Sequence, residues 1–154
     1  MSIHVNQAVP AFELMISDEE TIASRDLLGK NIVLYFYPKD NTPGCTQESK
    51  DFATLYSEFQ TANTEIFGIS RDSLKSHMKF KCQYNLPFEL ASDQNEALCQ
   101  LFDVLWPKNM FGKIINGISR STFLIDKKGL LRQEWRKVRV TDHAAVVLAA
   151  ARAL

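Results

Sequence analysis

The apolar run NIVLYFY, at residues 31–37, constrains the fold of this chain more than any other stretch. Its β-branched and aromatic residues predict a buried strand. The eight residues PKDNTPGC (38–45) follow directly, and apolar side chains then recur at helical spacing through residues 46–60. Residues 38–45 are therefore expected to form a strand-to-helix turn with a cysteine at the start of the helix.

Strand and helix patterns alternate along the rest of the chain. The other expected strands are 64–70, 88–91, 121–126 and 130–138, and the helices are 43–62, 74–84, 93–102 and 141–154. A short hairpin and loop with Phe12 and Leu14 pointing inward is expected before residue 31, and a loop or short hairpin at 106–117. This order predicts an α/β thioredoxin-like fold, with a central mixed sheet sandwiched between helices and a terminal antiparallel pair.

Length and composition limit the classes of protein to consider. The 154 residues contain no repeat or linker and predict a single domain, 1–154. Lys+Arg and Asp+Glu are both 18, which argues against nucleic acid or an anionic membrane as the main partner. No segment approaches the roughly 18 apolar residues of a membrane span, and the start of the chain lacks a signal-peptide pattern. Three scattered cysteines without a CxxC pair favour a reducing, cytoplasmic setting.

The turn at 38–45 places its cysteine in an unusual electrostatic environment. Thr42 is expected to be the N-cap of the helix and Pro43 its first residue, while Gly44 lets the backbone pass close to a neighbouring group. Cys45 then falls three residues after the cap, where its sulfur faces unpaired backbone N–H groups and the positive end of the helix dipole. These conditions favour a thiolate. The alternative is that Cys45 is a small buried hydrophobic residue, the commoner role of a lone cysteine.

Several stretches together resemble one known family. They are YFYPKDNTPGCTQES with the spacing PxxxTxxC, the GIS that ends the second strand, LPFELASD, WPKNMFG and GISRSTFLID. In order and spacing they are similar to the Q-type branch of the peroxiredoxins, whose members are also called bacterioferritin comigratory proteins. The similarity covers essentially the whole chain.

The resemblance implies a thiol peroxidase that needs neither a metal nor an organic cofactor. Cys45 would attack the O–O bond of a peroxide, expel water or an alcohol, and become a sulfenic acid. Thr42 would offer a hydroxyl to the peroxide, Arg120 a guanidinium to the thiolate and the transition state, and Pro43 would shield the pocket. The backbone N–H groups of Gly44 and Cys45 would hold an oxygen.

The resemblance leaves the resolving thiol open. In many members of this branch it lies five residues after the nucleophile, where this chain has Lys50. A second arrangement points to the end of the next helix and hence to Cys82, although the aligned position is one residue earlier, at Lys81. Cys82 is the expected resolving residue, with an exposed bystander as the alternative. Cys99 is expected to lie in the core.

The implied partners are hydrogen peroxide and organic hydroperoxides, with thioredoxin or a similar dithiol as the reductant and a monomer as the oligomeric state. The alternatives are a one-cysteine peroxidase resolved by an external thiol and a slow thiol redox sensor. A thioredoxin-like disulfide oxidoreductase is disfavoured by the missing CxxC pair.

Five further residues have two interpretations each. Glu48 either braces an arginine or is solvated in the first turn, and Arg120 would otherwise form a surface ion pair. Trp106, Met110 and Phe111 either ring the mouth of the active site or simply pack. The three histidines lack the mutual spacing of a metal site.

Overall fold

The computed structural model describes residues 3–154, and at positions 108 and 110 it describes the backbone alone. The strands are β1 (Glu13–Met15), β2 (Thr21–Ala23), β3 (Asn31–Phe36), β4 (Thr64–Ser70), β5 (Glu89–Ser92), β6 (Leu105–Met110), β7 (Lys113–Ile118), β8 (Ser121–Ile125) and β9 (Leu131–Arg136). The helices are α1 (Pro43–Thr54), α2 (Tyr56–Thr61), α3 (Leu74–Tyr84), α4 (Ala97–Leu101) and α5 (His143–Arg152), with a short 3₁₀ helix, η1 (Ser24–Leu27).

The expected mixed sheet is confirmed. Its strand order is β5-β4-β3-β8-β9, in which β3, β4 and β5 run parallel while β8 is antiparallel to both β3 and β9. Every residue of β3 is buried, as the run NIVLYFY predicts. Successive side chains of β3 alternate between the two faces of the sheet, and each face meets its own hydrophobic cluster.

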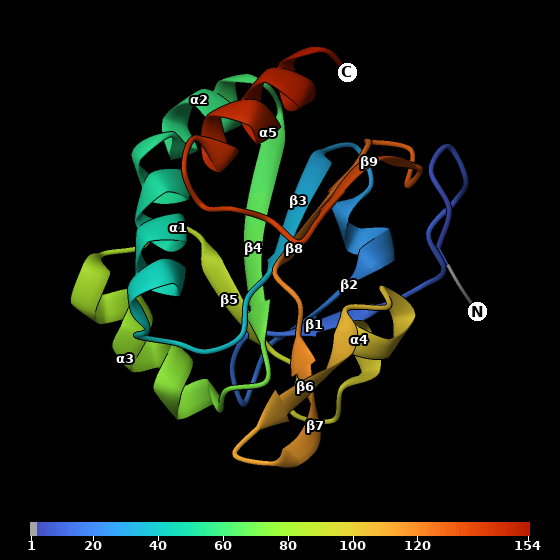
Figure 1. The fold of residues 1–154 in the computed structure, drawn as a ribbon. Helices are drawn as coiled ribbons and strands as arrows, with labels where there is room; N and C mark the ends of the chain where they lie inside the picture. Colours follow the sequence, from blue (N-terminus) through green and yellow to red (C-terminus); the bar gives the residue numbers. More distant parts are fainter. Residues whose placement is uncertain (1–2) are drawn as a thin grey trace.

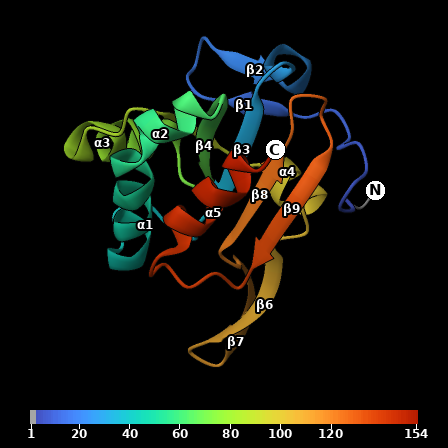
Figure 2. The ribbon, with the colours of Figure 1, turned by 90° about the horizontal axis from the view of Figure 1, so that it is seen from above.

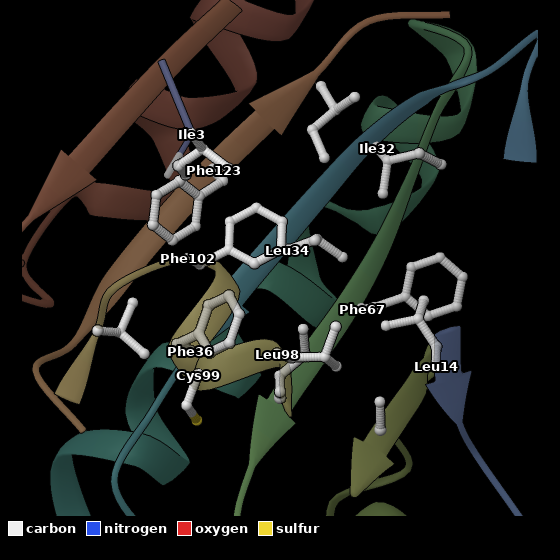
Figure 3. Packing of buried hydrophobic residues seen from close by; sticks show 14 of the residues in the cluster. Ile3, Leu14, Ile32, Leu34, Phe36, Phe67, Leu98, Cys99, Phe102 and Phe123 are labelled. Atoms are coloured by element: carbon white, nitrogen blue, oxygen red, sulfur yellow. The ribbon is translucent and has the colours of Figure 1, made fainter. Parts of the chain in front are cut away.

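Helices cover the sheet on both faces (Figures 1 and 2). On one face, Val33 and Tyr35 of β3 join a cluster with residues of α1, α2 and α5. On the other face, Leu34 and Phe36 pack with β1 and α4, as Figure 3 shows for Leu14, Leu98 and Phe102. This layered arrangement is the thioredoxin-like layout expected from the order of the elements.

Most element boundaries agree with the sequence prediction to within two residues. Leu14 is fully buried and Phe12 packs edge-on against Phe102, so the N-terminal pair points inward as expected. Residues 106–117 lie in a hairpin, β6–β7, which projects from the body of the molecule in both views. Within residues 3–154, no helix combines the length and hydropathy that a membrane crossing requires.

Two helix predictions are wrong in detail. The single helix expected at 43–62 is interrupted at Leu55, whose N–H is shared between the carbonyls of Asp51 and Phe52, a tightened last turn that ends α1 before α2 begins. The helix expected at 93–102 is shorter and follows Glu96, which has a φ of 62°. The two carboxylate oxygens of Asp93 accept hydrogen bonds from the N–H groups of Leu98 and Cys99 in the first turn of α4.

Candidate active site

The turn after β3 places Cys45 in the first turn of α1. Thr42 occupies the N-cap position with extended backbone angles, and Pro43 begins the helix. The first helical hydrogen bond runs from the Thr46 N–H to the Thr42 carbonyl, so the N–H groups of Gly44 and Cys45 precede the helical ladder. The Cys45 side chain is only 1% exposed. A buried sulfur therefore lies at the positive end of the helix dipole.

Thr42 is the N-cap residue of α1, as predicted, but its side chain makes no capping bond. Its hydroxyl donates to the Lys39 carbonyl at 2.9 Å, and it accepts no hydrogen bond from the described residues of α1. Because the hydroxyl proton is committed to Lys39, the oxygen lone pairs of Thr42 remain able to accept a hydrogen bond from a ligand.

Sheet register brings Arg120 to the cysteine across 75 residues of sequence. Ser121, the first residue of β8, pairs with Phe36, the last residue of β3. Arg120 therefore lies just beyond the end of β3, where the turn to α1 begins. Its Nη2 atom is 3.3 Å from the Sγ atom of Cys45 and donates a hydrogen bond to it.

Glu48 braces this arginine, which confirms the first of the two interpretations of Glu48. The Oε1 atom of Glu48 accepts a hydrogen bond from Nη1 of Arg120 at 2.6 Å, and the two side chains are 1% and 16% exposed. Gly44 makes room for the guanidinium, because a Cβ at this position would lie 3.3 Å from Nη2 of Arg120. The neighbouring group that the backbone of Gly44 approaches is therefore the side chain of Arg120. Because this ion pair is buried, the alternative interpretation of Arg120 as part of a surface ion pair is wrong.

Burial dominates the electrostatics of the Glu48–Arg120 pair. It raises the pKa of Glu48 from an ordinary 4.5 to about 7, although the adjacent Arg120 cation lowers it. The other carboxylate oxygen, Oε2, is buried and finds no hydrogen-bond partner among the described residues. For Arg120, burial acts to lower the pKa, but Glu48 and Cys45 together raise it above its usual value. Arg120 is therefore a cation whose charge is shared between a carboxyl group and a sulfur.

A buried histidine lies behind the site. Nε2 of His143 is 2.8 Å from the hydroxyl of Thr122, two residues beyond Arg120. Burial, and then the positive charge of Arg120, lower the pKa of His143 from 6.5 to about 4. The ring is consequently neutral at physiological pH and packs edge-on against Phe52 and Trp135.

A buried polar cluster next to the turn was not predicted from the sequence. Asp40 accepts hydrogen bonds from the Tyr37 hydroxyl at 2.6 Å and from the Ser76 hydroxyl at 2.8 Å, and its carboxylate is 2.7 Å from Nδ1 of His77. Candidate ligand atoms of Asp40, Asp72 and His77 lie within 4.8 Å of one another, but hydrogen bonds already use the atoms that a metal ion would need. An aspartate inside the turn motif was the available signal.

The three cysteines are all free. Cys99 is fully buried in the core, as expected (Figure 3), and burial raises the pKa of its thiol far above the usual range. Cys82 is exposed on α3, whereas Cys45 is buried at the start of α1. In this state the Cys82 thiol is accessible to solvent and is not bonded to Cys45.

The structure describes the side chains of two of the three hairpin residues that were considered for the mouth of the active site. Phe111 is 100% exposed at the tip of the β6–β7 hairpin, so the packing interpretation is wrong for it. Trp106 is 40% exposed, with Nζ of Lys137 4.9 Å from its ring centroid. The side chain of Met110 lies outside the described part of the structure. A role for Trp106 and Phe111 at the mouth stays a prediction.

Comparisons with known proteins identify the family to which the chain is similar. A model of the AhpC/TSA family matches residues 5–134. The chain is 50% identical to peroxiredoxin Bcp of Bacillus subtilis over 148 residues, covering 96% of this chain and 94% of the relative. It is 54% identical to peroxiredoxin Bcp of Xanthomonas campestris over 125 residues, covering 81% and 78%. A solved structure of the Xanthomonas campestris bacterioferritin comigratory protein, which concerns alkyl peroxide reduction activity, has 48% identity, a TM-score of 0.88, and coverage of 92% and 90%.

Proposed function

The chain belongs to the AhpC/TSA family and, within it, to the Q-type or Bcp branch of the peroxiredoxins, and from this we propose that Cys45 is the nucleophile that reduces hydrogen peroxide and organic hydroperoxides. As a member of this branch it is a peroxiredoxin enzyme. The observation that carries the proposal is the contact of 3.3 Å between the Arg120 guanidinium and the buried sulfur of Cys45. A guanidinium at that distance can stabilise the negative charge that passes from the attacking sulfur to the leaving oxygen.

The proposed reaction begins with attack of the Cys45 thiolate on one oxygen of the hydroperoxide. A sulfur–oxygen bond forms, the O–O bond breaks, and the leaving oxygen takes up a proton to give an alcohol or water. Cys45 is left as a sulfenic acid. The lone pairs of Thr42 would accept a hydrogen bond from the peroxide O–H, and Arg120 and the N–H groups of Gly44 and Cys45 would stabilise the developing negative charge.

Pro43 would complete this site from the solvent side. It begins α1 and is exposed, next to the two residues whose N–H groups precede the helical ladder. A ring at this position limits the approach of water and fixes the backbone at its φ angle. We assign it shielding of the pocket and no direct part in the chemistry.

In the second proposed step the Cys82 thiol attacks the sulfur of the sulfenic acid and releases water, which forms a Cys45–Cys82 disulfide. A disulfide brings its two Cβ atoms to about 3.8 Å. Since Cys45 is buried and Cys82 faces solvent, α3 has to move or partly unfold for this bond to form. A dithiol reductant such as thioredoxin would then restore both thiols in the cytoplasm, with the protein acting as a monomer.

Three cysteine variants test the function. Cys45→Ser should abolish peroxide consumption, and Cys99→Ser, which removes the core thiol, should retain it. Cys82→Ser should complete a single turnover and then accumulate sulfenic or sulfinic acid at Cys45. Non-reducing mass spectrometry after one equivalent of peroxide should detect a peptide pair joined through Cys45 and Cys82. Peroxide consumption by Cys45→Ser at the wild-type rate would refute the nucleophile, and a Cys45–Cys99 bond would refute the resolving residue.

A further inference from the structure

The polar cluster beside the active-site turn joins three parts of the chain. Asp40 lies in the turn, His77 and Ser76 lie on α3, and Ala91 belongs to β5. The carboxylate of Asp40 is 2.7 Å from Nδ1 of His77, and the His77 and Asp40 side chains are 4% and 3% exposed. The main-chain N–H of Asp40 also donates to Asp72, which follows β4. The turn that carries Cys45 is thus fastened to α3 inside the protein rather than at its surface.

The orientation of His77 uses both of its ring nitrogens. Nε2 lies 3.0 Å from the Ala91 carbonyl while Nδ1 faces the Asp40 carboxylate. The Ala91 carbonyl can only accept, so Nε2 donates to it, and Nδ1 shares a second hydrogen bond with Asp40. Asp40 also accepts hydrogen bonds from the Tyr37 and Ser76 hydroxyls. A buried polar pair of this kind is held in place by its full set of hydrogen bonds.

Few other groups fasten α3. Among its eleven described residues, His77 and Phe80 are the two that are buried. The Lys81–Glu89 ion pair is half-exposed, and screening by water weakens such pairs. One more hydrogen bond, from the Tyr84 hydroxyl to the Asn41 side chain, again ends in the Cys45 turn. Without the Asp40–His77 pair, Phe80 would be the main anchor of α3.

We propose that the Asp40–His77 pair is a latch that holds α3 against the Cys45 turn and that its opening controls formation of the Cys45–Cys82 disulfide. His77 is then a positioning residue for both steps of the reaction. While the latch is closed, the turn is held in its peroxide-reactive geometry; when it opens, α3 is released and Cys82 can reach the sulfenic acid. This role in resolution rests on the proposed function of Cys82.

The loss of a buried hydrogen bond that leaves its partner unsatisfied shifts an opening equilibrium about tenfold or more. His77→Phe removes both hydrogen bonds of the ring and should raise the opening of α3 by at least that factor, so that disulfide formation becomes faster. Sulfinic acid formation at high peroxide should fall correspondingly, because a sulfenic acid that is resolved sooner is exposed to peroxide for less time. The rate constant for the first attack on peroxide should fall, because the turn that carries Cys45 is loosened.

The first test is amide hydrogen exchange on the reduced, full-length protein, which requires no catalysis. In His77→Phe, exchange should accelerate about tenfold or more in both residues 38–45 and 74–84. His77→Asn, which can still donate one hydrogen bond to Asp40, should be intermediate. Val147→Ala is the matched control, because it removes buried volume from α5 on the same face of the sheet and should leave both segments unchanged. Unchanged exchange of α3 in His77→Phe, or an equal acceleration in Val147→Ala, would overturn the latch.

The second test measures the rate of disulfide formation after a single peroxide pulse. If this rate is the same in His77→Phe and in the wild type, the proposal that the latch controls formation of the Cys45–Cys82 disulfide is overturned. If Cys82→Ser shows that Cys82 does not resolve the sulfenic acid, the exchange experiment still decides whether the latch exists, so the two failures are distinguishable. Should His77→Phe fail to fold, Ser76→Ala removes one hydrogen bond from Asp40 and should change both rates in the same direction, but less.

Discussion

Replacing Glu48 by glutamine removes a titrating group from beside Arg120 while keeping an oxygen that can accept the guanidinium hydrogen bond. In the wild type, burial raises the pKa of Glu48 to about 7, whereas the unfolded chain has the ordinary value of 4.5. The folded state therefore holds a proton that the unfolded state releases between these two values. This contribution to stability is complete below pH 4.5 and is lost as the pH rises through 7.

The magnitude follows from the two pKa values. A pKa that rises from 4.5 to about 7 is equivalent to about 3 kcal/mol at about 1.36 kcal/mol per pKa unit, and about 2.5 kcal/mol of it falls between pH 5 and pH 8. Glu48→Gln has no such titration. Its free energy of unfolding, compared with that of the wild type, should therefore rise by about 2.5 kcal/mol from pH 5 to pH 8. A change in the hydrogen bond to Arg120 that does not depend on pH would shift the whole profile without changing this slope.

Urea denaturation at several pH values, with the thiols kept reduced, measures this difference. Glu58→Gln is the matched control, because Glu58 is a half-exposed helical glutamate that also pairs with an arginine, Arg152. Its pH profile should run parallel to that of the wild type. If the Glu48→Gln profile is also parallel to the wild type, the raised pKa is refuted, and with it the account of Glu48 as a poorly solvated buried carboxyl group.

Three further variants test the surroundings of the cysteine. Burial lowers the pKa of His143 to about 4, whereas in the unfolded chain this histidine has its ordinary pKa of 6.5. The unfolded state therefore takes up a proton first as the pH falls, and the free energy of unfolding should decrease by about 2 kcal/mol from pH 7 to pH 5. In urea denaturation, His143→Gln should lose this pH dependence. Arg120→Met should lower the rate constant for peroxide by about 10²–10³, as for the loss of a preorganised charge donor, and stopped-flow fluorescence measures it. Gly44→Ala places a Cβ 3.3 Å from the Arg120 guanidinium and should slow peroxide attack about tenfold without lowering the melting temperature, since alanine favours the helix; an unchanged rate would exclude the close fit.

Strands β3, β4 and β8 could be predicted because each is a buried, mostly apolar run. The prediction of 64–70 coincides with β4, in which six of the seven residues are buried. The break at Leu55 could not be predicted, since apolar residues continue at helical spacing across it and only the local hydrogen bonds change. The shorter α4 could not be predicted either, because it depends on the left-handed backbone of Glu96 and on the local hydrogen bonds from Leu98 and Cys99 to Asp93.

The positions of Cys45 and Arg120 could be expected from motifs, but their contact depends on sheet register. The pairing of Phe36 with Ser121 brings the two motifs together, and no local pattern in the sequence encodes it. The latch was missed for the same reason, because Asp40 and His77 meet only once α3 has packed beside the turn. The orientation of the Thr42 hydroxyl could not be predicted. The sequence does not show whether this hydroxyl donates to the Lys39 carbonyl or accepts from an N–H group of α1.

The central claim is that the fold itself makes one buried sulfur reactive. The most direct test is the rate constant for hydrogen peroxide with a Cys82→Ser/Cys99→Ser double variant, in which Cys45 is the remaining thiol, measured by competition with a reference peroxidase. The account predicts a rate constant several orders of magnitude above that of free cysteine, with the sulfenic acid trapped at Cys45. A rate constant equal to that of free cysteine would contradict it.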